Sequence, residues 1–235
     1  MYGTFLQIIN ETGQEDVLLE GEPVEKTLSI WELITSGGPG AVFIMGLLFL
    51  LSIVAVYIFV ERFGAIKNAN KLDKNFMNNI KDHISNGKLE SAMALCESTD
   101  TPVARMMEKG VSRIGKSLDD ISASIENQGK LEIQRLEKNL PFLATISGGA
   151  PMIGFLGTVI GMIITFKEMA NAGGQINIGL MAEGIYTAMS TTVGGLFVGI
   201  FAYFGYNYLV ARIEAVIYKM ETSATEFLDL LHEPV

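Results

Sequence analysis

Hydroxyl side chains lie inside two long apolar stretches of this 235-residue chain, where a simple membrane anchor would carry mostly leucine. Thr158 stands in the run GFLGTVIGMIITF, and a second run, TAMSTT, holds four hydroxyl groups within six residues. A lone threonine in an apolar helix usually bonds to a carbonyl of its own preceding turn and is structural. Several hydroxyls on facing helices can instead line a narrow polar path. The predicted path residues are Thr158, Thr165, Thr187, Thr191 and Thr192.

Small residues recur at helical spacing beside these hydroxyls. Gly154 and Gly161 share one helical face with Thr158, and the second apolar stretch contains a G-x-x-x-G pair. Such spacing lets two helix backbones approach closely in lipid, where packing and hydrogen bonding replace the hydrophobic effect. Pro151 frees the carbonyl of Ser147, which must find another partner or border a cavity. The residues predicted to pack helices are Gly154, Gly157, Gly161, Gly195, Gly199 and Pro151.

The apolar stretches contain no titratable acid or base. Residues 37–60, 141–166 and 184–211 lack Asp, Glu, His, Lys and Arg altogether. Membrane proteins that move protons use ionisable side chains as relays, and a threonine hydroxyl does not titrate at physiological pH. If this chain conducts protons, another chain must therefore carry the acid.

Composition argues against several other kinds of site. Cys96 is the single cysteine, and His83 and His232 are far apart in sequence, so we expect no disulfide and no metal site. We also expect no cofactor. The net charge of −9 argues against a nucleic-acid binder, because neutralising phosphates requires clustered Lys and Arg.

Residues 110–117, GVSRIGKS, match the phosphate-binding pattern G-x-x-x-x-G-K-[ST]. That chemistry needs a buried strand before the first glycine and a helix after the lysine, so that backbone N–H groups surround phosphate. The preceding residues, TPVARMMEK, are typical of a helix instead. Gly115 as a helix C-cap and Ser117 as the next N-cap explain the same letters without a nucleotide. An ATPase is therefore a minor alternative.

Hydropathy predicts an all-α integral membrane protein with three transmembrane helices. The chain is 49% apolar and only 18% charged, and each uncharged stretch exceeds the roughly 20 residues that a spanning helix needs. The two later helices should extend into a helical cytoplasmic domain. The expected segments are an external acidic tail (1–38), spans at 39–61, 140–167 and 184–211, a cytoplasmic helical domain (62–139), an external loop (168–183) and a cytoplasmic C-terminal helix or tail (212–235).

The distribution of basic residues predicts the orientation. Thirteen of the 17 Lys and Arg residues fall between residues 62 and 139, whereas residues 1–38 carry seven acids and one lysine. Basic flanks resist translocation, so residues 62–139 and the C-terminus should be cytoplasmic and the N-terminus periplasmic.

The predicted cytoplasmic domain consists of short helices. Turn signals separate helices over 73–85 and 88–97, and a third helix begins near Thr101-Pro102. Ser117 is the expected N-cap of the next helix, with Asp120 as its acidic partner. Because apolar residues continue at helical spacing up to Leu140, we expect one helix from about Leu118 to Phe166.

The two glycine-rich stretches together resemble a known family. GGAPMIGFLGTVIGMIITF and GIYTAMSTTVGGLFVGIFAYFGYNYLV resemble the pore-lining helices of the MotA/TolQ/ExbB proton-channel family, and the Glu61-Arg62 pair after the first span is similar too. The similarity covers about residues 40–211, including the number of spans. The pattern APxxGxLGTVxGM is fairly specific, and the whole looks closest to ExbB, with TolQ as its sibling.

The resemblance implies a homo-pentamer in the bacterial inner membrane that surrounds the single membrane helices of an ExbD- or TolR-like partner. The partner's aspartate would carry the proton, and the complex would drive a TonB- or TolA-like protein for outer-membrane transport. Thr158 and Thr192 match the family's channel threonines. Bilayer lipids are the other expected partners, and nucleic acid is not.

Two departures from the family pattern leave alternatives open. Thr187 stands where a glutamate is common, and the acidic tail of residues 1–38 is longer than expected. The extra hydroxyls leave sodium open as the coupling ion. The alternatives to an ExbB-like proton channel are a TolQ-like subunit for envelope integrity or gliding, a sodium-coupled stator, and a non-conducting membrane scaffold.

Overall fold

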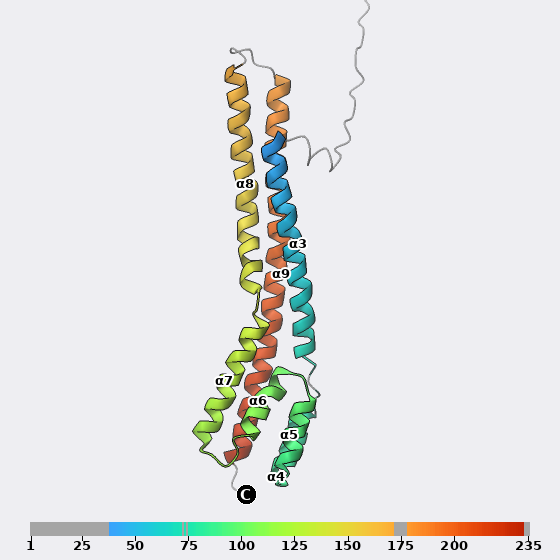
Figure 1. Ribbon diagram of the computed structural model, residues 1–235, viewed down its shortest axis with the longest axis vertical. Helices are drawn as coiled ribbons and strands as arrows, with labels where there is room; N and C mark the ends of the chain where they lie inside the picture. Colours follow the sequence, from blue (N-terminus) through green and yellow to red (C-terminus); the bar gives the residue numbers. More distant parts are fainter. Residues whose placement is uncertain (1–37, 72, 74, 172–177, 233–235) are drawn as a thin grey trace, which may run out of the picture.

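The computed structural model describes residues 38–71, 73, 75–171 and 178–232, and this part of the chain is helical with no strand. The predicted acidic tail at 1–38 falls almost wholly outside these residues. Figure 1 shows three long helices side by side above a group of shorter ones. The helices are α3 (Gly38–Ala69), α4 (Phe76–Ser85), α5 (Leu89–Ser98), α6 (Pro102–Val111), α7 (Leu118–Leu136), α8 (Leu140–Asn171) and α9 (Ile178–His232).

The apolar half of the molecule consists of α3, α8 and residues 178–211 of α9. Within the described residues, three helices are long and apolar enough to cross a bilayer, in agreement with the predicted number. Large apolar side chains cover the outer surface, and Phe43 and Phe197 are 72% and 74% exposed. A soluble protein would bury such side chains, so this surface is suited to lipid. At 1.5 Å per residue, the 32 residues of α3 or α8 run about 48 Å, well beyond about 30 Å of hydrocarbon.

The helical domain consists of α4 to α7 with residues 212–232 of α9. Long apolar side chains fill its centre, and Ile80, Met107 and Phe227 are fully buried. α9 runs unbroken from the apolar half into this domain, as Figure 1 shows. One buried cluster of side chains therefore continues along α9 through both halves.

The local start signals of the short helices are confirmed. Thr101 caps α6, its side-chain oxygen accepting a hydrogen bond from the Ala104 N–H, with Pro102 in the first turn. Ser117 caps α7 in the same way, accepting from the Asp120 N–H. Gly87 sits between α4 and α5 at a φ of 69°, a left-handed conformation that glycine adopts without strain.

The structure interrupts the helix that was expected to be continuous from Leu118 to Phe166. α7 ends at Leu136 and α8 begins at Leu140, with Asn139 at a φ of 67° between them. Asparagine tolerates this left-handed conformation better than most residues, and Pro141 suits the first turn of a new helix. The expected loop at 168–183 is also shorter, because α8 continues to Asn171 and α9 starts at Ile178.

Candidate functional site

The contact between α8 and α9 in the apolar half leaves no room for side chains at its centre. A methyl group placed on Gly195 would lie 2.6 Å from the Ala150 carbonyl oxygen and 2.8 Å from the Gly154 Cα. A methyl group on Gly154 would lie 2.7 Å from the Thr191 carbonyl oxygen. The two backbones therefore touch directly at this level, because both helices present glycine there.

The same contact extends along both helices from this centre. A methyl group on Gly161 would lie 2.8 Å from the Ala188 Cβ, and one on Gly157 would lie 2.5 Å from the Thr191 Oγ1. In the other direction Gly199 meets the ring of Pro151, whose Cγ would be 2.5 Å from an added Cβ. All six residues predicted to pack helices thus lie between α8 and α9.

Two threonine hydroxyls meet across this contact. Thr158 of α8 and Thr192 of α9 are hydrogen-bonded through their Oγ1 atoms. Each hydroxyl also lies within hydrogen-bond distance of a carbonyl on the opposite helix: Thr158 Oγ1 is 3.1 Å from the Ala188 oxygen, and Thr192 Oγ1 is 3.2 Å from the Gly154 oxygen. Both side chains are half-buried, so they lie at the edge of the helix contact.

Thr158 and Thr192 have more hydrogen-bond contacts than they have hydroxyl protons to fill them. Two hydroxyls supply two protons for three contacts, so one of the three always lacks a proton. Rotating the hydroxyls about their C–O bonds changes which contact is unmade and moves no heavy atom. The pair can therefore donate to, or accept from, a polar group that approaches from outside the two helices.

The other predicted path residues are placed differently. Thr191 is fully buried and its Oγ1 lies 2.7 Å from the Ala188 oxygen and 3.1 Å from the Gly154 oxygen, so it joins the helices. Thr165 donates to the Gly161 carbonyl of its own helix at 2.9 Å and packs against Gly184. It lies seven residues, about 10 Å, along α8 from the threonine pair. Thr187 is buried at the same end of α9, one turn before Thr191.

A charged pair about two turns before the end of α3 contacts the interruption between α7 and α8. The Arg62 side chain is buried, forms an ion pair with Glu61 and donates to the Arg135 carbonyl oxygen at 2.9 Å. The Asn139 amide donates to the Glu61 carboxylate at 3.4 Å. The sequence drew attention to Glu61-Arg62 only through the family resemblance. Its contact with the helix interruption was not predicted.

A buried carboxylate lies in the helical domain and was missed by the sequence analysis. Glu132 is 1% exposed and accepts hydrogen bonds from Arg105 at 2.7 Å, Gln128 at 2.8 Å and Arg135 at 2.9 Å. The pKa of the Arg105 guanidinium is raised, first because it donates to the Glu132 carboxylate. Because the Arg135 carbonyl accepts from Arg62 of α3, polar contacts run from α3 through α7 to α6.

The segment that matches the phosphate-binding pattern lacks the buried strand that a nucleotide site needs before its first glycine, although the helix α7 does follow the lysine. Gly110 lies in the last turn of the helix α6, so the residues before it form a helix and not a strand, as predicted. Gly110 itself is packed, since a methyl group there would lie 2.8 Å from Ile125 and Phe227 side-chain atoms. The expected C-cap at Gly115 is wrong, because Ser112 caps α6 and Gly115 lies in the following turn at a φ of 97°.

The isolated thiol and the acids form no metal centre in the part of the chain that the structure describes. No group of three His, Cys, Asp or Glu side chains lies together there. Burial among apolar side chains raises the pKa of the Cys96 thiol to about 12, first through desolvation. A thiol with this pKa stays protonated and unreactive at neutral pH.

Comparison with known proteins places these features in a family context. The model of the MotA/TolQ/ExbB proton channel family matches residues 98–222, which include α8, the interruption before it and the threonine pair. The Tol-Pal system protein TolQ of Pseudomonas aeruginosa is 29% identical over 228 residues, covering 92% of this chain and 98% of that protein.

Relatives named ExbB are similar to this chain to a degree comparable with that of the TolQ relatives. The biopolymer transport protein ExbB of Neisseria meningitidis is 27% identical over 190 residues, 74% of this chain and 84% of the relative. The TolQ protein of Haemophilus influenzae is 38% identical over a shorter region of 101 residues, 43% of this chain and 44% of the relative. TolQ and ExbB proteins therefore both occur among the relatives.

Proposed function

The chain belongs to the MotA/TolQ/ExbB proton channel family, and from that premise we propose that it is an ion-conducting motor subunit of the bacterial inner membrane. In this proposal it works with a single-span ExbD- or TolR-like partner that carries the proton-binding aspartate. The complex converts the proton-motive force into work on a TonB- or TolA-like protein that acts at the outer membrane.

The observation that carries the proposal is the threonine pair in a contact without titratable groups. Thr158 and Thr192 present reorientable hydroxyls at the edge of the α8–α9 contact, and the apolar stretches around them have no acid or base. A carboxylate brought by a partner helix could hydrogen-bond to these hydroxyls in both its charged and its neutral form. The chain would thus supply an uncharged polar wall, and the partner would supply the proton carrier.

The arrangement of subunits is part of the same proposal. A homo-pentamer would place five α8–α9 pairs around the partner helices, with the N-terminus periplasmic and the helical domain cytoplasmic. One elementary charge crossing the membrane potential releases about 2.3 kcal/mol per 100 mV, so several protons can drive a mechanical step.

The test is proton flux into liposomes that contain the chain and its partner, measured with an internal pH-sensitive dye under an imposed potential. Thr158→Val and Thr192→Val should each lower the flux by about tenfold or more, the equivalent of a lost hydrogen bond. The matched control is Thr145→Val, because Thr145 is exposed on the same helix and donates to the Pro141 carbonyl of its own turn.

The oligomer should remain intact in all three variants. Wild-type flux in both Thr158→Val and Thr192→Val would remove the proposed role of the pair. Liposomes that contain the chain alone should not acidify. If they acidify as fast as liposomes with both components, the partner is not the proton carrier.

A TolQ-like role is the second candidate, because the Pseudomonas aeruginosa TolQ protein matches nearly its whole length. Expression in cells that lack either TolQ or ExbB separates the two roles. Restored envelope integrity without restored outer-membrane uptake would favour TolQ, and the reverse would favour ExbB. Replacing sodium in the liposome assay tests the sodium-coupled alternative.

A further inference from the structure

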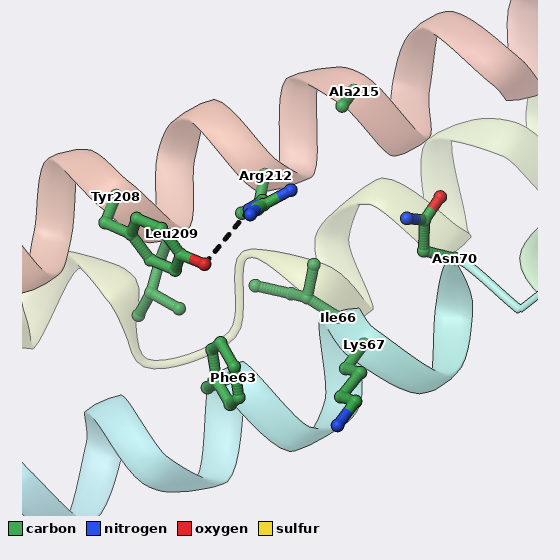
Figure 2. A pocket seen from close by; sticks show the side chains of 8 residues that line it. All are labelled: Phe63, Ile66, Lys67, Asn70, Tyr208, Leu209, Arg212 and Ala215. Carbon is green, nitrogen blue, oxygen red and sulfur yellow. Dashed lines mark hydrogen bonds between the residues drawn. The ribbon is translucent and has the colours of Figure 1, made fainter.

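A pocket of about 230 Å³ lies between α3 and α9, where the uncharged stretches of both helices end. Figure 2 shows Phe63 and Lys67 of α3, with Asn70 directly after that helix, on one side and Tyr208 and Arg212 of α9 on the other. The pocket thus combines aromatic rings with cations. It is separate from the threonine pair, which lies between α8 and α9.

Two cations, Lys67 and Arg212, line this pocket, and a third, Lys219, contacts its lining residue Asn70. Arg212 donates from Nε to the Tyr208 hydroxyl at 3.1 Å, and its guanidinium carbon lies 5.1 Å from the centre of that ring. Lys219 donates to the Asn70 side chain at 2.5 Å. Among the residues that the structure describes, no ion pair includes Lys67, Arg212 or Lys219. Their positive charge is therefore available to an anion.

An apolar groove of about 400 Å³ adjoins the pocket on the membrane side. Phe201, Phe204 and Gly205 line it, and Tyr208 belongs to both the groove and the pocket. The rings of Phe59 and Phe63 lie 6.4 and 6.2 Å from that of Tyr208, so aromatic side chains connect the two spaces. A ligand that fills both must have an anionic end and an apolar tail.

We propose that this site binds one anionic glycerophospholipid, with its phosphate between Lys67 and Arg212 and an acyl chain in the groove beside Phe201 and Phe204. Basic pockets between membrane helices near the headgroup level suit anionic lipid heads, and three cations favour a lipid with a net negative charge over a zwitterionic one. The site requires only that the apolar half lie in a bilayer. It is independent of which side α4 to α7 face and of ion conduction.

The test is lipid binding to the purified full-length oligomer in detergent, measured by native mass spectrometry. Dioleoyl phosphatidylglycerol is titrated against dioleoyl phosphatidylcholine. Lys67→Gln with Arg212→Gln should weaken phosphatidylglycerol binding by about fivefold for each charge removed, about 25-fold together. Lys81→Gln with Lys88→Gln removes the same charge from α4 and the turn after it, neither of which lines the pocket, and should leave binding unchanged.

The other occupants of the site give distinguishable results. Equal binding of phosphatidylcholine would overturn the proposal. Unchanged phosphatidylglycerol binding in the Lys67→Gln, Arg212→Gln double variant, the pocket variant, would also overturn it. Full displacement by millimolar inorganic phosphate, or equal binding of dihexanoyl phosphatidylglycerol, would indicate a phosphate site without a lipid tail. Dissociation of the oligomer in the pocket variant, with unchanged lipid per chain, would mean that a second copy of the chain fills the groove.

Discussion

The two halves of the molecule pack helices against the same helix, α9, by opposite means. In the apolar half α8 meets α9 through glycines, so that the backbones touch and hydroxyls bond across the contact. In the helical domain long apolar side chains pack α6 and α7 against α9, such as Met107 of α6, Ile125 of α7 and Phe227 of α9. The Glu132 carboxylate is buried nearby and pairs with two arginines. The glycine contact tolerates no added atom, whereas the domain depends on a charge that must not be removed.

This difference follows from the surroundings of each half. Lipid tails are as apolar as leucine, so burying leucine between spans gains little, and close backbone approach gains more. Water surrounds the helical domain, so long apolar side chains are stabilised by burial there. A buried charge is also tolerated in the domain when several hydrogen bonds satisfy it, as three do for Glu132.

Removing the buried charge should have the largest effect. Glu132→Ala removes the buried acceptor of three hydrogen bonds and should lower the free energy of unfolding of the helical domain by about 3–5 kcal/mol, because hydrogen bonds to a charged group contribute about 1.5–3 kcal/mol each. Thermal unfolding followed by circular dichroism measures the loss. Glu126→Ala is the matched control on α7, because Glu126 forms an exposed pair with Lys130 and should change stability little. Equal losses in the two variants would mean that the buried network is not specially important.

Adding one methyl group to the glycine contact should have the next largest effect. Gly195→Ala places a Cβ 2.6 Å from the Ala150 carbonyl oxygen, so the helices must separate, at a cost of about 1–3 kcal/mol. Gly148→Ala is the control on α8, since a methyl group there meets nothing within 4 Å. Unfolding in detergent should distinguish them. An unaffected Gly195→Ala protein would contradict the tight contact.

Removing a helix cap in the domain should have the smallest effect of the three. Ser117→Ala removes the acceptor for the Asp120 N–H and should cost about 1 kcal/mol, measured by chemical denaturation. Lys116→Ala should leave stability unchanged. ATP turnover by the purified chain that is lost in Lys116→Ala would restore the nucleotide hypothesis for residues 110–117.

Sequence reasoning succeeded where helical spacing determines the contact and failed where the surroundings do. The spacing of Thr158 from Gly154 and of Thr192 from Gly195 placed these residues on facing surfaces, and the structure brings the two threonines together. Glu132 resembles any solvated acid on an amphipathic helix, and its burial depends on Arg105 of another helix. The interruption at Asn139 was hidden by the continuing apolar spacing. Pro141 was the available signal, since proline favours a helix's first turn.

The unbroken backbone of α9 makes its two ends mechanically dependent. Fifty-five residues form a rod of about 82 Å, and tilting it by about ten degrees about one end displaces the other by about 14 Å. α7 and α8 are joined at Asn139, where a change in direction can be absorbed by the joint. A displacement of α9 near Thr192 is therefore transmitted along the continuous helix to Phe227. A displacement of α8 near Thr158 reaches the helical domain only through the joint at Asn139, which Glu61 and Arg62 hold.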